Sequence, residues 1–231
     1  MAGALLRDRM RDLVRNNPHA AKAVSVLVNN IVGAGIIPRA ASGNEPARLV
    51  IESQASMSLW ARPQPIDLAQ TPYLCWRWRV SHALRSADMA TKSGDDYAAR
   101  VYVAFSLPKD SLSWGTRTKL ALARKIYGDT VPDAALNYVW DNRQPEGHSA
   151  PNAYTAQTQM VVQRSGAALS GRWVHECRDL RADAAKWLPP GAKPVMLAVA
   201  ADTDNTGEQV TAEFADLGLY AADPRTGRVQ D

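Results

Sequence analysis

The sequence predicts a mainly β protein: an antiparallel β-sandwich of jelly-roll type with two short helical insertions and an N-terminal helical appendage. Past Gly43 the apolar residues alternate with a period of two, as on half-buried strands. Eight or more such runs occur with only two helical segments between them, which argues against βαβ winding. The 231 residues, 46% of them hydrophobic, are enough for one core. We therefore expect the sandwich at 43–221, the appendage at 1–42 and a tail at 222–231.

The appendage contains two predicted amphipathic helices. The first has apolar residues at i, i+4, i+7 and i+8, namely Leu6, Met10, Leu13 and Val14. The second has the same kind of stripe at Val24, Leu27, Val28 and Ile31, and we expect Gly33, Gly35 and Pro38 to end it. Of the 27 basic and 23 acidic residues, six basic and two acidic residues lie in 1–42, so the remainder carries 21 of each. The body is neutral, and nucleic-acid binding is not expected of it.

The predicted strands of the body are the runs at 49–53, 73–80, 100–105, 136–141, 159–164, 173–178, 195–201 and 210–219. The predicted helices are 112–126 and 179–187, the latter capped by Asp179 and ended by Pro189. The run 195–201 is apolar on both faces, which predicts a central strand. We expect 210–219 to be its hairpin partner across the turn at 202–208. No run reaches the ~18 apolar residues of a membrane-spanning helix.

Tryptophan and arginine residues are interleaved within the predicted strands. Trp and Tyr make up 14 of the 16 aromatic residues, and none precedes Trp60. Such residues occur in sandwich cores and on surfaces that bind polar ligands. Arginines on sheet faces close a polar network in one interpretation, and line a groove for a polar ligand, such as a saccharide, in the other. The predicted ligand-binding residues are Trp76, Trp78, Arg100, Asn137, Trp140 and Arg178.

Acidic residues suggest a cation site in two segments. The segment 202–208 approaches an EF-hand pattern, in which Glu213 is the twelfth position counted from Asp202. The candidate calcium ligands are Asp202, Asp204 and Asn205. Strands rather than helices flank this segment, so a structural turn is the alternative, and no other cofactor is expected. Asp95 and Asp96 precede Arg100 and are expected to form an internal ion pair with it.

The sequence contains no recognisable catalytic motif, such as a nucleophile elbow or a phosphate-binding loop. A non-catalytic binding module is therefore the expected function. A metal-dependent hydrolase built on Asp95, Asp96, Asp202 and Asp204 is one alternative. Cys75 and Cys177 match no zinc or redox spacing and are expected to be buried free thiols, with an inter-strand disulfide as the alternative in an exported protein.

Two parts of the chain resemble known families. The strings 11–18 and 28–36 resemble the start of lambda-type phage portal proteins over about 40 residues, which implies a fusion, a misassigned start or, as a rival function, a phage structural protein. The motifs at 73–78, 94–103, 136–140 and 202–207 resemble domain-of-unknown-function family 3047 over about 47–220. That resemblance implies no activity. Its members usually begin with a secretion signal, which implies export, but the portal-like segment stands in that place here, so compartment and oligomeric state stay open.

The last predicted strand carries a further resemblance. Its pattern at 212–217 is similar to that in galactose-binding-like jelly rolls of carbohydrate-binding modules. This similarity is one of fold, and a fold does not by itself determine a function.

Overall fold

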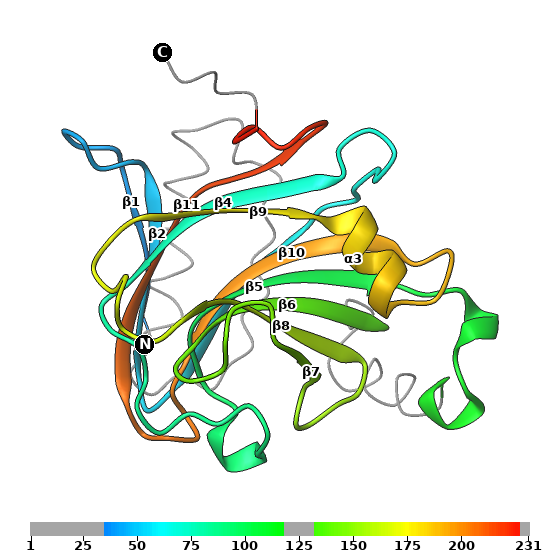
Figure 1. Ribbon diagram of the computed structural model, residues 1–231, viewed down its shortest axis with the longest axis horizontal. Helices are drawn as coiled ribbons and strands as arrows, with labels where there is room; N and C mark the ends of the chain where they lie inside the picture. Colours follow the sequence, from blue (N-terminus) through cyan, green and yellow to red (C-terminus); the bar gives the residue numbers. More distant parts are fainter. Residues whose placement is uncertain (1–34, 118–131, 227–231) are drawn as a thin grey trace, which may run out of the picture.

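The computed structural model describes residues 35–117 and 132–226, which form two β-sheets packed face to face (Figure 1). One sheet has five strands, in the spatial order β1 (Gly35–Arg39), β2 (Arg48–Gln54), β11 (Gln209–Tyr220), β4 (Tyr73–Val80) and β9 (Val174–Asp179). The other has six, in the order β3 (Met57–Pro63), β10 (Lys193–Asp202), β5 (Tyr97–Ser106), β6 (Ala134–Asp141), β8 (Thr158–Ser165) and β7 (Ser149–Pro151). The predicted β-sandwich is confirmed.

The core lies between the sheets and contains most of the large aromatic rings. Trp76 and Trp78 face inward from β4, because they alternate with Arg77 and Arg79 on the strand. Trp76 packs against Tyr138 of β6 with ring centroids 5.6 Å apart, and Trp78 packs against Trp140 of β6 at 5.7 Å. These contacts join the two sheets directly.

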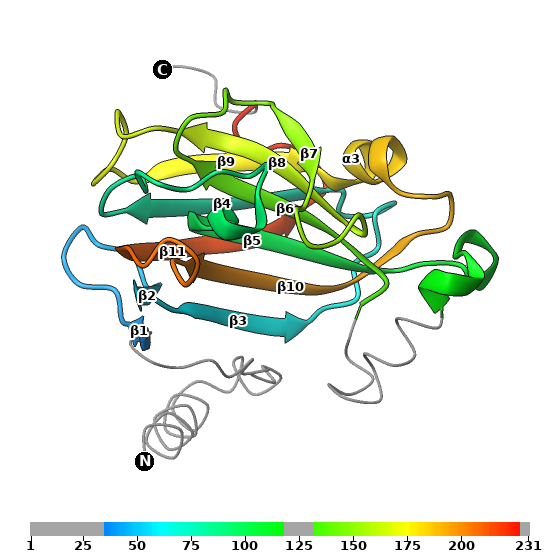
Figure 2. The same cartoon turned by 90° about the horizontal axis from the view of Figure 1, so that it is seen from below.

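Strand pairing is antiparallel throughout the described sheets except between β6 and β8, which run parallel. Figure 2 views the molecule from the side of the six-stranded sheet, where β3, β10, β5 and β6 lie side by side. The short strand β7 forms the last strand of that sheet through its pairing with β8.

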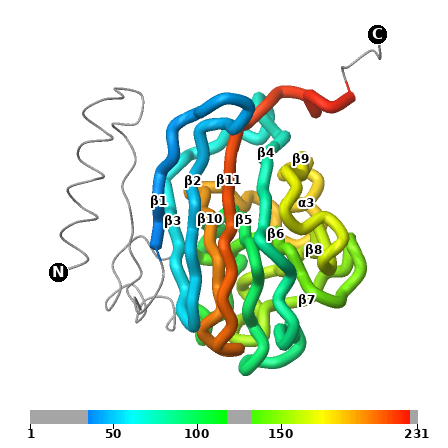
Figure 3. The backbone as a smooth tube through the Cα atoms, turned by 90° about the vertical axis from the view of Figure 1, so that its left-hand side faces the viewer, coloured from blue at the N-terminus to red at the C-terminus, as the bar shows by residue number. Residues whose placement is uncertain are grey.

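The sandwich begins earlier in the chain than the sequence predicted. Gly35 and Pro38, expected to end a helix of the appendage, belong to strand β1, which pairs with β2 over Gly35–Arg39 (Figure 3). Pro38 is tolerated because β1 is an edge strand, where one side of the backbone needs no ladder partner. The two helices expected at 6–14 and 24–31 lie outside the described residues.

The predicted hairpin of β10 and β11 is wrong. Strand β10 lies inside the six-stranded sheet between β3 and β5, whereas β11 lies inside the five-stranded sheet between β2 and β4. Alternating hydrophobicity indicates a half-buried strand but does not specify which sheet it joins. The connection at 203–208 is long enough to cross the ~10 Å between packed sheets.

A buried hydroxyl cluster anchors this crossing. The connection between β2 and β3 also passes from one sheet to the other, and the two meet at Thr203. The Thr203 hydroxyl lies 2.8 Å from the Ser53 hydroxyl and 3.3 Å from the Ser56 carbonyl oxygen. The start of the β10–β11 connection is thereby fixed, which positions the acidic residues on either side of Thr203.

Helix α3 (Leu180–Trp187) confirms the second predicted helix. Its N-cap is Asp179, which accepts a hydrogen bond from the backbone amide of Ala182 at 3.0 Å. For the helix expected at 112–126, helical residues begin at 114, and 118–131 lie outside the described part of the chain. No helix among the described residues is long and apolar enough to cross a bilayer.

Cys75 and Cys177 form a disulfide, which corrects the expectation of free thiols. They are direct neighbours across β4 and β9, where Cys75 pairs with Cys177 in the strand register. Their separation of 102 residues gave no indication of this contact, because the register of two distant strands cannot be read from spacing.

Candidate functional site

The predicted ligand-binding residues separate into two groups. Trp76, Trp78 and Trp140 are at most 1% exposed and pack in the core, so they present no surface on which a ligand could stack. Arg178 lies on β9, where its guanidinium donates to Asp183 at 2.9 and 2.5 Å and lies over the ring of Tyr138. Burial corrects the role predicted for the three tryptophans, whereas the role of Arg178, whose side chain is 30% exposed, stays a prediction.

Arg100 and Asn137 lie together on the outer face of the six-stranded sheet. On β5, Val101 and Val103 belong to the core, so Arg100 and Tyr102 point to the opposite face. Tyr102 pairs directly with Asn137 of β6 in the strand register. This face therefore carries a group of polar side chains, which we call the Arg100 cluster: Asp95, Tyr97, Arg100, Tyr102, Asn137 and Asp202.

Arg100 is the centre of the cluster and is almost fully buried. Its guanidinium donates to Asp202 at 2.8 Å, to Asp95 at 3.3 Å and to the Tyr102 hydroxyl at 2.9 Å, and it lies 4.3 Å from the ring centroid of Tyr97. Of the two acidic residues expected to pair with Arg100, Asp95 does so, whereas Asp96 accepts hydrogen bonds from Asn205 and Thr206. Asp202, which the sequence grouped with a cation site, is a second acidic partner of Arg100.

The cluster has unused hydrogen-bonding capacity. Four of its polar atoms are buried and have no hydrogen-bond partner among the described residues: Tyr97 Oη, Arg100 Nε, Asn137 Oδ1 and Asp202 Oδ1. Leaving a buried polar atom unpaired costs about 1–3 kcal/mol, so such atoms usually bind water, an ion or a ligand. Burial also raises the pKa of Asp202 to about 7; Arg100 opposes this shift, whereas Asp96 and Asp204 add to it.

An exposed aromatic ring stands beside the cluster. Tyr154, in the connection between β7 and β8, is 56% exposed. Its hydroxyl lies 2.9 Å from the carbonyl oxygen of Lys92 and 3.0 Å from Asn205 Oδ1, which fixes the ring although it faces solvent. Two residues earlier, Asn152 donates to both carboxylate oxygens of Asp95, at 2.9 and 2.7 Å. The Tyr154 ring is therefore tied to the Arg100 cluster through its own loop.

Two of the three predicted cation ligands meet a third carboxylate. Asp96, Asp202 and Asp204 each place an oxygen within 4.8 Å of the others. Asn205 has a different role, because its amide donates to Asp96 at 3.0 Å and to Asp204 at 2.8 Å. Glu213, the twelfth position of the EF-hand-like pattern, lies on β11 of the five-stranded sheet and pairs with Arg79 of β4 in that same sheet. The segment 202–208 is therefore a turn that also brings Asp202 and Asp204 to Asp96, and it does not form an EF-hand.

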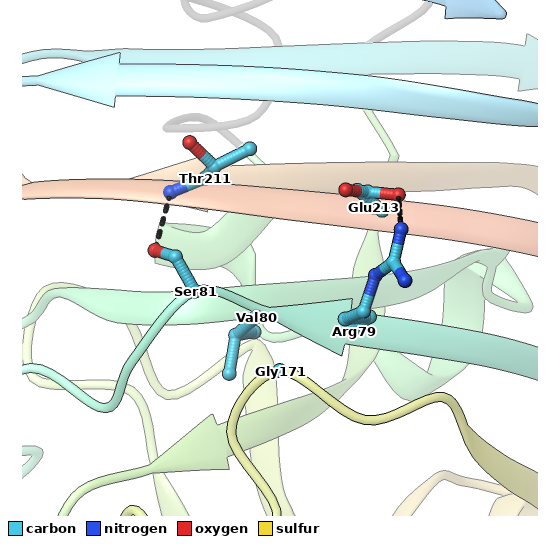
Figure 4. A pocket seen from close by; sticks show the side chains of 6 residues that line it. All are labelled: Arg79, Val80, Ser81, Gly171, Thr211 and Glu213. Carbon is cyan, nitrogen blue, oxygen red and sulfur yellow. Dashed lines mark hydrogen bonds and ion pairs between the residues drawn. The ribbon is translucent and has the colours of Figure 1, made fainter.

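The outer face of the five-stranded sheet carries two adjoining hollows. One, of about 220 Å³, is lined by Arg79, Val80, Ser81, Gly171, Thr211 and Glu213 (Figure 4). The other, of about 420 Å³, shares Ser81 and Thr211. Arg79 donates to Glu213 at 2.6 Å and to Glu45 at 3.0 Å, and stacks on Trp173 at 4.6 Å. Among the described residues, no side chain that lines these hollows has a buried unpaired polar atom, unlike the Arg100 cluster, so we take that cluster and Tyr154 as the candidate site.

Comparison with known families identifies the body of the chain. The family model described as protein of unknown function (DUF3047) matches residues 39–218. The chain belongs to this family. A second model, phage portal protein of the lambda family, matches residues 1–73, which extends past the appendage into β1–β3 and the start of β4 of this DUF3047 chain.

Solved structures similar to this DUF3047 chain include proteins named for cellulose and carbohydrate. A metagenome-derived glycoside hydrolase family 12 endoglucanase has 12% identity and a TM-score of 0.43, covering 84% of this chain and 88% of its own. Endoglucanase Cel12A from Rhodothermus marinus has 11% identity, a TM-score of 0.41 and coverages of 84% and 90%. The family 30 carbohydrate-binding module of a Clostridium thermocellum cellulase has 12% identity and a TM-score of 0.38, covering 87% of this chain and 91% of its own. The search of curated proteins found no match.

Sequence reasoning missed Tyr97, Tyr102, Asn152 and Tyr154. Tyr97 and Tyr102 flank Arg100 on one strand, and the alternation that places Arg100 outward also places Tyr102 outward, so that signal was present. Asn152 and Tyr154 lie in a connection without periodicity. Only the fold brings them to Asp95 and Asn205.

Proposed function

We propose that this protein is a non-catalytic binding module for a polar, hydroxyl-rich ligand such as a saccharide, bound at Tyr154 and the adjoining Arg100 cluster. The observation that carries the proposal is the Tyr154 ring, which is 56% exposed yet held by its hydroxyl next to Lys92 and Asn205. A large aromatic ring that is fixed and exposed offers a stacking surface at little entropic cost.

The surroundings of the ring suit hydroxyl groups. Asp204 and Asn205 are exposed beside it and offer carboxylate and amide groups, which can accept from or donate to neighbouring hydroxyls. Behind them lie the unpaired polar atoms of the Arg100 cluster, including Asp202 Oδ1. A few placed polar groups next to an apolar surface are the usual composition of a small-ligand site.

The charge of the site favours a neutral ligand over an anionic one. Four carboxylates, those of Asp95, Asp96, Asp202 and Asp204, stand against the two cations Arg100 and Lys92. A uronic acid or a phosphate would meet this negative excess with Coulombic repulsion. We therefore expect neutral oligosaccharides to bind more tightly than acidic ones of the same length when no divalent cation is bound to these carboxylates.

Isothermal titration calorimetry with neutral and uronic acid-containing oligosaccharides tests the proposal. Tyr154→Ala should reduce the affinity for a bound neutral oligosaccharide about 5- to 30-fold, because losing a stacking ring costs about 1–2 kcal/mol. Tyr220→Ala removes another exposed tyrosine, at the end of β11, and should leave the affinity unchanged. Equal losses in both variants, or no binding by the wild-type protein to any neutral oligosaccharide, would refute the proposal.

A metal-dependent hydrolase is a second candidate, supported by the convergence of Asp96, Asp202 and Asp204 and by Arg100, which joins Asp95 to Asp202. Incubation of the bound oligosaccharides with the protein and Ca²⁺, followed by measurement of new reducing ends, distinguishes the two functions. Release that Asp95→Asn abolishes would favour the hydrolase. Binding without release would favour the binding module.

A further inference from the structure

We infer that Asp96, Asp202 and Asp204 form a binding site for a divalent cation, Ca²⁺, where the β10–β11 connection meets the start of β5. Asp96 immediately precedes β5, Asp202 ends β10, and Asp204 follows two residues later. The site therefore joins two neighbouring strands of the six-stranded sheet to the crossing between the sheets.

The geometry of the three carboxylates fits one calcium ion. One oxygen from each residue lies within 4.8 Å of the others. Two oxygens on opposite sides of a Ca²⁺ at about 2.4 Å are about 4.8 Å apart, and three spaced evenly around it are about 4.2 Å apart, so small side-chain movements are enough to bring the three oxygens to one ion.

The connection is held in this arrangement by Asp96 itself. One oxygen of Asp96 accepts from the Asn205 amide side chain at 3.0 Å, and the other accepts from the backbone amide of Thr206 at 2.7 Å. These bonds fix both the carboxylate and the turn that carries Asp204. A preorganised set of ligands binds a cation more tightly, because less ordering is needed on binding.

An unpaired oxygen of Asp202 points independently to a bound cation. Asp202 is only 5% exposed, and its Oδ2 pairs with Arg100 at 2.8 Å. Its Oδ1 is buried and has no hydrogen-bond partner among the described residues. A buried carboxylate oxygen without a donor is costly, and coordination to a cation supplies the missing partner. Asp204 is exposed, so the ion can reach the site from solvent.

The donors select a hard cation. All three ligands are carboxylate oxygens, which suit Ca²⁺ rather than the softer transition metals. Ca²⁺ takes six to eight oxygen ligands, so positions remain for water or for a hydroxyl of a ligand held at Tyr154. The cation site does not rest on saccharide binding, because its ligands all belong to the chain.

Calcium titration of the full chain, without saccharide, tests the inference by thermal unfolding. Ca²⁺ should raise the Tm of the wild-type protein in a saturable manner, because an ion that binds only the folded state stabilises that state. EGTA should reverse the shift. Asp204→Asn, at an exposed position, should weaken the apparent Ca²⁺ affinity at least tenfold. The matched control is Asp110→Asn, which should retain the wild-type affinity. Asp110 is exposed and lies beyond the other end of β5, so the length of that strand, about 33 Å, separates it from the proposed site.

Terbium luminescence provides a readout that does not depend on stability. Tb³⁺ should bind the wild-type protein with emission sensitised by nearby tyrosine, and excess Ca²⁺ should displace it. The emission should be lost in Asp204→Asn and kept in Asp110→Asn. Absence of a saturable response in the wild-type protein, or equal responses in the two variants, would overturn the inference.

A subsequent oligosaccharide titration separates the cation site from the proposed function. Saturable Ca²⁺ binding without oligosaccharide binding would leave the cation site standing and remove the saccharide proposal. Oligosaccharide binding with no Ca²⁺ response in either assay would support the saccharide proposal and remove the cation site.

Discussion

Replacing Arg100 by methionine tests whether the Arg100 cluster is as buried and interdependent as the structure indicates. Arg100 is 4% exposed and is the cation that pairs with both Asp202 and Asp95. Breaking a buried ion pair by removing one partner costs about 3–5 kcal/mol. Asp95 keeps its two bonds from Asn152, so most of the penalty falls on Asp202. For a chain of this size the expected fall in Tm is about 6–20 °C.

The double variant Arg100→Met/Asp202→Asn decides the cause of this loss. If the uncompensated charge of Asp202 causes it, neutralising that charge should recover at least about 1 kcal/mol relative to Arg100→Met, measured by urea denaturation. A stability of Arg100→Met within about 1 kcal/mol of the wild-type protein, or a double variant less stable than the single one, would show that the charge of Asp202 does not cause the loss.

Three further perturbations test the core, an interior carboxylate and the disulfide. Trp140→Ala should lower the free energy of unfolding by about 3–5 kcal/mol in urea denaturation, because the ring is 1% exposed and joins the two sheets; a loss below about 1 kcal/mol would contradict a core position. Burial raises the pKa of Glu176 from 4.5 despite its bonds to Arg164, so its contribution to stability is full below pH 4.5 and is lost as the pH rises through the raised value. Glu176→Gln should remove that decline from the pH profile of unfolding; an unchanged profile would show that another group causes it. Reduction of the Cys75–Cys177 disulfide, which closes a loop of 102 residues, should destabilise the fold by about 2–5 kcal/mol, and mass spectrometry of the unreduced protein should find no free thiol.

The sequence predicted the elements well and their neighbours poorly. Apolar patterning located eight of the eleven strands in the described residues but not β1, β3 or β7, and the cap at Asp179 located α3. The same alternation was compatible with either sheet for β11, so the hairpin with β10 was wrong. Pairing between distant strands depends on register, which also decides that Cys75 meets Cys177.

The sequence predicted only part of the candidate site, because contacts between distant strands depend on register. On β4, Trp76 and Trp78 share a face with Leu74 and Val80, which is typical of a core position, yet both rings were predicted to bind a ligand. Arg100 and Asp202 are 102 residues apart, and their contact follows from the pairing of β5 with β10. Tyr154 lies in an irregular connection, where neither period nor propensity indicates which groups it will meet.

Mapping ligand binding onto the two outer faces by NMR tests the proposed site most directly. On addition of a neutral oligosaccharide that binds in calorimetry, we expect the largest amide shift changes at residues 152–154 and 203–206. Changes around Arg79 and Thr211, which line the hollow on the five-stranded sheet, should be small. Shift changes concentrated around Arg79 and Thr211, with residues 152–154 unaffected, would contradict the proposed site.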